Sequence, residues 1–235
     1  MKNFKRFTLL EMIIIIAIFG ILLSILLPSL GKARAKGKSV VCLSNISQHM
    51  QALILYSKDN ESKFPKRVQE NVNGGESNWA LCSGIDEGSS AAYFPTEKRQ
   101  LNKFLGVDSN SDPGVNLCPS NRGQWLFDIV GTSYQYNTFY GPDYSSNNNA
   151  YITIAVPGKT TFVTQINSPS LFVGFSEIDA YGRIIDGITK SPHLSDKRFS
   201  LGFIDGHVTR TSIEQRIMNN ENYSYIHESS SSFTE

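Results

Sequence analysis

The sequence predicts an α+β fold in which a long N-terminal helix packs on an antiparallel β-sheet head. Three observations predict this class. Residues 7–30 form one apolar run, residues 31–58 repeat apolar side chains at three- and four-residue steps, and β-branched or aromatic runs separated by turns begin near residue 150. Because the pattern changes in this way along the chain, we expect one anchor helix and one head, not two globular domains.

Charge and composition exclude two classes of protein. The 235 residues carry 22 Lys and Arg against 21 Asp and Glu, which gives a net charge of +1. A nucleic-acid-binding protein normally has a strongly basic face, so no nucleic-acid partner is expected. The 40% hydrophobic content also excludes an acidic, solvating, disordered chain.

The first predicted element is a membrane-spanning helix over residues 7–30. Met12–Leu27 is interrupted only by Gly20 and Ser24, and neighbouring apolar residues extend the run to about 20 residues, or about 30 Å of helix. This length matches the hydrocarbon core of a bilayer, where a helix satisfies its backbone hydrogen bonds and a lone strand does not. Basic residues flank both ends, so charge alone does not orient the helix: Lys2, Lys5 and Arg6 precede it, and Lys32, Arg34, Lys36 and Lys38 follow it.

A cleaved secretory signal is the alternative interpretation of the same segment. Ala33-Arg34-Ala35 fits the A-x-A pattern of a signal-peptidase site. The apolar region of a signal peptide is normally about 7–15 residues, however, and this run is longer. An arginine inside the pattern and lysines on both sides also make a poor cleavage site, so the sequence favours the membrane anchor.

Glu11 is a carboxylate inside the apolar segment. A charge there costs about 2.5–3.5 kcal/mol at mid-bilayer and less near the end of a helix, so such a residue is a functional candidate. The alternative is an interfacial glutamate that reaches the headgroup region.

The N-terminal block resembles a known processing site. The segment Phe7–Glu11 (Phe-Thr-Leu-Leu-Glu), followed by a long apolar helix, is similar to that of type IV prepilins and type II secretion pseudopilins. The resemblance implies that a prepilin peptidase removes residues 1–6 as a short leader and methylates the amine of Phe7. The family usually has glycine where this chain has Arg6. By the same resemblance, Glu11 neutralises the amine of a neighbouring subunit, and Pro28 kinks the helix.

The resemblance also implies function, partners and location. It implies a pilin-like fold and a non-enzymatic structural subunit of a type II secretion or type IV pilus-like filament. Its partners are then the prepilin peptidase, other pilin or pseudopilin subunits, an inner-membrane assembly platform and membrane lipid. The resemblance also implies a single pass through the bacterial inner membrane, with the head in the periplasm. The alternative function is a membrane-anchored module that binds a glycan or polymer without joining a filament.

Residues 31–60 are predicted to continue the helix as an amphipathic stem. Signals for helix termination appear only at Lys58–Ser62, and Pro65 follows. We expect the head to cover residues 61–218 and a flexible tail to cover residues 219–235. The stem face expected to pack on the head consists of Leu30, Ala33, Gly37, Val40, Leu43 or Ser44, Ser47, Met50 and Ile54.

Later blocks resemble a narrower pseudopilin branch that is named for its H-X9-DG block. The chain shows His193 and then Asp205-Gly206, with eleven residues between the histidine and the aspartate instead of nine. The other blocks are Ala33-Arg34-Ala35, Cys42–Gln48 with Tyr56, Leu117–Ser120 and Ser133–Asn137.

Cysteine number predicts one disulfide. Outside the cytoplasm, the three residues Cys42, Cys82 and Cys118 give one pair and one free thiol in the simplest case. Cys82–Cys118 would join two loops, and Cys42–Cys118 would fasten the stem to the head. The resembling branch carries cysteines at the latter two sites and so favours Cys42–Cys118. The sequence contains no CxxC pair, so the cysteines do not predict a metal site.

The head is predicted to contain a short helix near Thr96–Leu105 and an antiparallel sheet of roughly four to six strands. Asp205-Gly206 is expected to form the two-residue turn of a hairpin. The expected strands are Tyr151–Val156, Thr160–Gln165, Ser170–Phe175, Gly182–Ile185, Phe199–Ile204 and His207–Ile213.

The head contains candidate ligand residues for calcium and for sugars. No catalytic motif appears, and turn chemistry explains Asp205 beside His207 without an enzyme site. Glu177, Asp179 and Asp186 offer carboxylates for calcium, although no calcium-loop spacing is present. Aromatic residues that could stack on sugars, if exposed, are Trp79, Trp125, Tyr134, Tyr136, Tyr140 and Tyr144.

Overall fold

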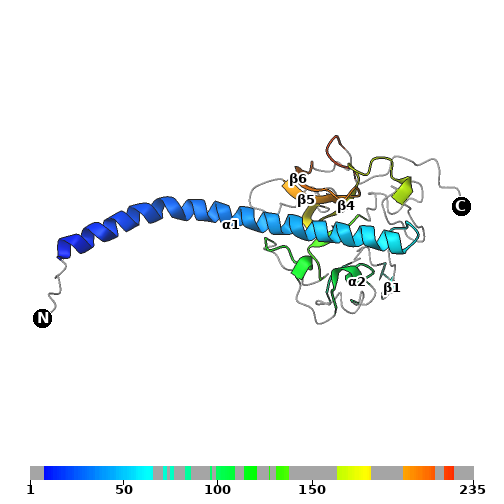
Figure 1. Cartoon of the computed structure of the whole chain (residues 1–235), viewed down its shortest axis with the longest axis horizontal. Coiled ribbons are helices and arrows are strands. Elements are labelled where there is room, and N and C mark those ends of the chain that lie inside the picture. The colour runs from blue at the N-terminus through cyan, green and yellow to red at the C-terminus, as the bar shows by residue number, and fades with distance from the viewer. Residues whose placement is uncertain are drawn as a thin grey trace. The chain divides into compact units, whose positions relative to one another are not determined.

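The computed structural model describes the chain in several stretches. They are residues 8–65, 71–72, 75–76, 83–85, 96, 99–108, 114–120, 127, 131–137, 163–180, 198–214 and 220–224. The chain divides into two compact units, Met1–Gly37 and Lys38–Glu235. A long helix and a four-stranded antiparallel sheet confirm the predicted α+β class (Figure 1).

Helix α1 is the first element and runs from Leu9 to Asp59, 51 residues. It continues on both sides of Pro28, which lies inside it. It ends where the sequence predicted, because Glu61 and Ser62 adopt positive φ angles of 56° and 61°. The backbone N–H of Ser62 then donates to the carbonyl oxygen of Ser57 at 2.8 Å, which satisfies one of the orphan carbonyls at the helix end.

The sheet in the head has the strand order β3-β4-β5-β6, with every neighbouring pair antiparallel. Its strands are β3 (Tyr134–Tyr136), β4 (Val173–Glu177), β5 (Arg198–Phe203) and β6 (Val208–Ser212). A separate two-stranded pair consists of β1 (Asn71–Val72) and β2 (Gly75–Glu76).

Three predicted strands have counterparts in this sheet, and one prediction is wrong. β4, β5 and β6 correspond to the expected strands that begin at Ser170, Phe199 and His207. Val163–Gln165, which was expected to end a strand, forms a 3-10 helix instead. β3 was not predicted as a strand. The expected strands Tyr151–Val156 and Gly182–Ile185 lie outside the described residues.

The part of α1 that contains Met50 packs on one face of this sheet, at two glycines of the strands. A Cβ atom added to Gly202 would lie 2.6 Å from Cγ of Met50, and one added to Gly174 would lie 2.8 Å from Cε of Met50. Gly202 lies in β5, and Gly174 lies in β4 where the register shifts. The missing side chains therefore let the helix approach the strands closely.

The predicted packing face of the stem is wrong in its helical phase. Val40 is exposed, and Leu43, Ser47 and Ile54 are only partly buried. The face that packs on the head is rotated from the predicted one and shares only Met50 with it. Its buried residues are Ser39, Cys42, Asn45, Ile46, His49, Met50, Ala52, Leu53 and Ser57.

The hairpin at Asp205-Gly206 forms, but its loop is one residue longer than predicted. The N–H of Phe203 donates to the carbonyl oxygen of His207 at 3.0 Å, and the N–H of Gly206 donates to that of Phe203 at 2.8 Å. Ile204 and Asp205 are therefore the central turn residues, and Gly206 follows them with a φ of 95°. Glycine at this position suits a three-residue loop, in which the residue after the turn has positive φ.

The described head also contains a 3-10 helix at Gly114–Asn116, a short α-helix and a packed segment near the C-terminus. Among the described residues, the predicted helix near Thr96–Leu105 corresponds to α2, Asn102–Leu105, which ends at Gly106 in the left-handed conformation. Part of the segment predicted to be a flexible tail is packed, because Tyr223 is buried among side chains of the sheet. The N–H of Val173 donates to the carbonyl oxygen of Ser224 at 2.8 Å, which fixes residues 220–224 beside β4.

Candidate functional site

Glu11 forms a reciprocal cap at the start of α1. Its carboxylate oxygen Oε2 accepts hydrogen bonds from the backbone N–H of Thr8 at 2.8 Å and from the Thr8 hydroxyl at 2.9 Å. The N–H of Glu11 in turn donates to the Thr8 hydroxyl oxygen at 3.3 Å. This is a capping box, in which a Thr at the N-cap and a Glu three residues later satisfy each other's backbone donors.

Sequence reasoning missed Thr8 as a partner of Glu11. The signal was present, because Thr-Leu-Leu-Glu before an apolar run has the spacing of a capping box. Among the described residues, all hydrogen bonds to the Glu11 carboxylate go to Oε2. The second oxygen, Oε1, accepts none of these bonds.

The apolar half of α1 exposes its side chains along its whole length. Their exposed fractions lie between 41% for Ile15 and 79% for Leu9. The helix is long and apolar enough to cross a membrane, and none of its most apolar stretch is buried in the protein. A monomer in water rarely exposes a contiguous apolar surface of this size, so lipid or other protein must cover it.

The predicted processing residues Arg6 and Phe7 lie outside the described residues, which begin at Thr8. Pro28 lies within α1, on the apolar half. Two nearby serines bond to their own helix: the hydroxyl of Ser24 donates to the carbonyl oxygen of Ile21 at 2.7 Å, and that of Ser29 to Leu26 at 2.8 Å. These serines can therefore lie in an apolar environment without an unsatisfied donor.

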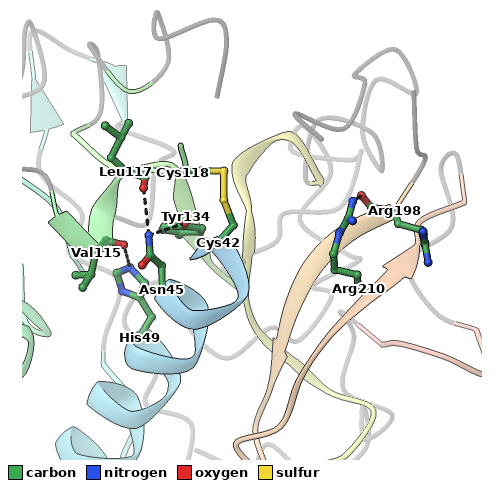
Figure 2. Close-up of a disulfide and its surroundings, with 9 residues drawn as sticks. All are labelled: Cys42, Asn45, His49, Val115, Leu117, Cys118, Tyr134, Arg198 and Arg210. Carbon is green, nitrogen blue, oxygen red and sulfur yellow. Dashed lines mark hydrogen bonds between the residues drawn. A yellow bond between two sulfur atoms is a disulfide. The ribbon is translucent and has the colours of Figure 1, made fainter. Parts of the chain in front are cut away.

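A disulfide joins the stem half of α1 to the head. Cys42 and Cys118 are bonded, with their Cα atoms 5.3 Å apart. This is the pair that the resemblance implied, and Cys82 lies outside the described residues. Beside it, the side-chain amide of Asn45 donates to the carbonyl oxygen of Leu117 at 3.1 Å and to the Tyr134 hydroxyl at 3.0 Å (Figure 2).

His49 lies one turn further along the same face and is fully buried. Its Nε2 lies 3.2 Å from the carbonyl oxygen of Val115 (Figure 2). Its Nδ1 lies 3.2 Å from the Ser83 hydroxyl. Because a carbonyl oxygen only accepts, we assign the proton to Nε2 and let Nδ1 accept from Ser83. The ring also stacks on Phe175, with centroids 5.1 Å apart.

Burial holds His49 in the neutral form. Desolvation lowers the pKa of its imidazole to about 4, although the bond to Val115 acts in the opposite direction. Burial also raises the pKa of the neighbouring Tyr134 hydroxyl, so this residue is neutral as well. His49 and Tyr134 are therefore two neutral polar side chains at the junction between stem and head, beside the disulfide.

The weak calcium candidates are not brought together as an exposed site. Glu177 is 1% exposed in β4, next to the Cys42–Cys118 pair. The two sulfurs are bonded to each other and cannot act as thiolate ligands. Asp179 follows two residues later and is partly buried, and Asp186 lies outside the described residues. A calcium site in the head stays a prediction, and the burial of Glu177 does not support that residue as a ligand.

The hairpin motif shows turn chemistry. Asp205 Oδ1 accepts from the backbone N–H of His207 at 3.1 Å and lies 2.6 Å from Nδ1 of its ring. The ring stacks on Phe203, with centroids 4.2 Å apart. His193, the first residue of the motif, lies outside the described residues.

Two of the six aromatic residues that were candidates for sugar binding are in the core. Tyr134 and Tyr136 are 1% and 0% exposed, so these two candidates offer no stacking surface to a sugar. Their side chains instead join the core cluster that contains Met50 and Phe175. The other four, Trp79, Trp125, Tyr140 and Tyr144, lie outside the described residues.

The long N-terminal helix and the antiparallel sheet define a pilin-like α+β protein. Residues 2–27 match the family model of the prokaryotic N-terminal methylation motif. The chain is also similar to the type IV wide pilus major component PilA4 of Thermus thermophilus, with 37% identity over 62 residues. That match covers 26% of this chain and 47% of the relative, so it spans about half of the relative's length. No solved structure matches the chain.

Proposed function

We propose that the protein is a structural subunit of a type II secretion or type IV pilus-like filament. The observation that carries this proposal is the methylation motif at the start of a helix whose apolar half is exposed. In the membrane, lipid covers that surface, and in a filament the apolar helices of neighbouring subunits cover it. The long apolar segment and the motif also support an inner-membrane anchor with the head in the periplasm.

In the filament, Glu11 would favour the register of neighbouring helices in which a partner amine compensates its charge. A buried charge without a partner is costly, and removal of one member of a buried ion pair costs about 3–5 kcal/mol. The amine of Phe7 on a neighbouring subunit, exposed by cleavage after Arg6, is the proposed partner. The capping box supports this role because it orients the carboxylate towards the helix N-terminus and leaves Oε1 for that amine.

Substitution of Glu11 tests this function. Glu11→Val and Glu11→Gln should still insert into the membrane but should lower the amount of protein in sheared, pelleted filaments by about tenfold or more, as expected for a loss above about 1.4 kcal/mol. Ser24→Ala is the matched control, because Ser24 is a polar residue of the same apolar segment that bonds only to its own helix. Normal incorporation of both Glu11 variants would sink the mechanism.

Processing and location need separate measurements. The intact mass of the protein from its native host should correspond to a chain that begins at methylated Phe7. A chain that begins at Lys36 would instead establish ordinary signal cleavage. Replacement of residues 7–30 with an unrelated membrane-spanning helix should abolish filament incorporation, whereas a simple anchored binding module would keep its function.

The two filament systems differ in their phenotypes. Loss of a type IV pilus subunit removes surface filaments, whereas loss of a secretion pseudopilin leaves the secreted proteins in the periplasm. A deletion strain examined by electron microscopy and by analysis of its culture medium therefore assigns the subunit to one system.

A further inference from the structure

Three cations follow the apolar run of α1, and no acidic residue of the helix lies near them. Lys32, Arg34 and Lys36 are all exposed. Between Glu11 and Asp59 the helix contains no Asp or Glu. We call these three residues the cationic girdle. Lys38, two residues further along the sequence, has the same sign of charge.

The girdle occupies two opposite sides of the helix. Successive residues of an α-helix are rotated by about 100°, so Lys32 and Lys36 lie about 40° apart and Arg34 lies on the opposite side. A groove on a partner protein contacts one face of a helix and would leave part of this charge unpaired. Lipid headgroups surround a membrane helix on all sides, so the arrangement fits lipid better.

The girdle also lies at the position along the helix where a lipid headgroup layer is expected. Lys32 lies about 34 Å along the helix from Leu9, and Lys36 lies about 6 Å further. The hydrocarbon core is about 30 Å thick, and the headgroup regions extend the bilayer to about 40–45 Å. If Leu9 lies at one edge of the core, the girdle therefore begins just beyond the other edge. The long side chains keep their charged ends at the polar interface.

We propose that Lys32, Arg34 and Lys36 bind the phosphates of anionic phospholipids in the leaflet on the head side of the membrane. The proposal rests on the membrane anchoring that the proposed function includes. Clusters of basic residues next to a membrane helix attract anionic lipid. The leader carries the other basic flank, Lys2, Lys5 and Arg6, which cleavage before Phe7 would remove. The girdle then remains the basic flank of the mature subunit.

Lipid selectivity of the full-length protein tests the proposal. The protein is reconstituted in phosphatidylcholine bilayers with a trace of spin-labelled phosphatidylglycerol or spin-labelled phosphatidylcholine, and electron paramagnetic resonance gives the ratio of their association constants. We expect a preference of about two- to fivefold for phosphatidylglycerol, which shrinks in 0.5 M salt. The triple variant Lys32→Gln, Arg34→Gln, Lys36→Gln should bring the ratio close to one.

Two control variants separate the girdle from net charge and from the leader. Lys58→Gln, Lys63→Gln, Lys103→Gln removes three cations outside the girdle and should keep the preference. Lys2→Gln, Lys5→Gln, Arg6→Gln removes the leader cations and should keep most of it. An unchanged ratio in the girdle variant, or a ratio lost only in the leader variant, overturns the proposal.

Two further readouts distinguish this proposal from the proposed function. Flotation with the vesicles tests anchoring alone, and if the wild-type protein fails to float, the anchor and the girdle proposal both fail. If the protein floats and incorporates into filaments but shows no lipid preference, only the girdle proposal fails. If the girdle variant keeps the wild-type lipid ratio but loses filament incorporation, the girdle contacts protein instead, which also overturns the proposal.

Discussion

Acidification should destabilise the junction between stem and head through His49. The fully buried ring has a pKa of about 4 in the folded protein, below its ordinary value of 6.5. Between these two pH values, the unfolded state binds a proton at this residue and the folded state does not. Stability therefore rises with pH in this window and is lost as the pH falls from 6.5 to 4.

The size of the effect follows from the shift. A difference of one pKa unit corresponds to about 1.4 kcal/mol, so the shift from 6.5 to about 4 amounts to about 3 kcal/mol once the pH is below both values. Tyr134 and Ser83, which lie next to the ring, are neutral in this range. Neither residue can therefore offer an anionic partner to the protonated ring, and they do not offset the cost of burying its charge.

Urea unfolding of the detergent-solubilised full-length protein measures this contribution. The free energy of unfolding is determined at several pH values between 7 and 4 for the wild type, for His49→Gln and for His207→Gln. Carboxylates elsewhere titrate equally in all three, so the difference between wild type and His49→Gln isolates His49. His207→Gln, which removes a histidine at an exposed position of the hairpin, is the matched control. Parallel pH profiles of wild type and His49→Gln would refute the reasoning.

Three other predictions concern the same contacts. The double variant Cys42→Ser, Cys118→Ser should lower the free energy of unfolding by about 4 kcal/mol, because the disulfide closes a loop with a sequence separation of 76 residues. Urea unfolding with and without reductant measures this loss. An unchanged unfolding midpoint would contradict the prediction. Gly202→Ala should cost about 1–3 kcal/mol by overpacking against Met50, whereas Gly106→Ala, which meets no neighbour but has positive φ, should show backbone strain alone. Thr8→Ala should cost about 1 kcal/mol of cap energy, seen as faster amide exchange in the first turn of α1, and unchanged exchange would argue against the capping box.

Part of the candidate site could be predicted because its signals are local. The apolar run, Glu11 within it and the stop of α1 near residue 60 all follow from side chains that are close in sequence. The signal of the capping box is local too, because Thr8 lies three residues before Glu11. The disulfide was different, because three cysteines leave the pairing open and only the resemblance favoured Cys42–Cys118.

The stem shows where local pattern fails. Apolar residues occur on several sides of the helix between Val40 and Leu55, so three- and four-residue spacing fits more than one phase. The face that packs includes the polar residues Asn45 and His49, which a hydrophobic pattern counts against burial. Their partners, Leu117, Tyr134 and Val115, come from segments 66 to 89 residues further along the chain.

The amino-acid sequence is enough to predict the membrane-length helix, the class of fold and the hairpin at Asp205-Gly206. Each depends on backbone preferences and on hydrophobicity within one segment. Long-range contacts set three other outcomes: the face of the stem that packs on the head, the burial of Tyr134 and Tyr136 in the core, and the packing of residues 220–224 beside β4. These outcomes depend on distant partners, such as the space left by Gly174 and Gly202, and no local pattern contains that information.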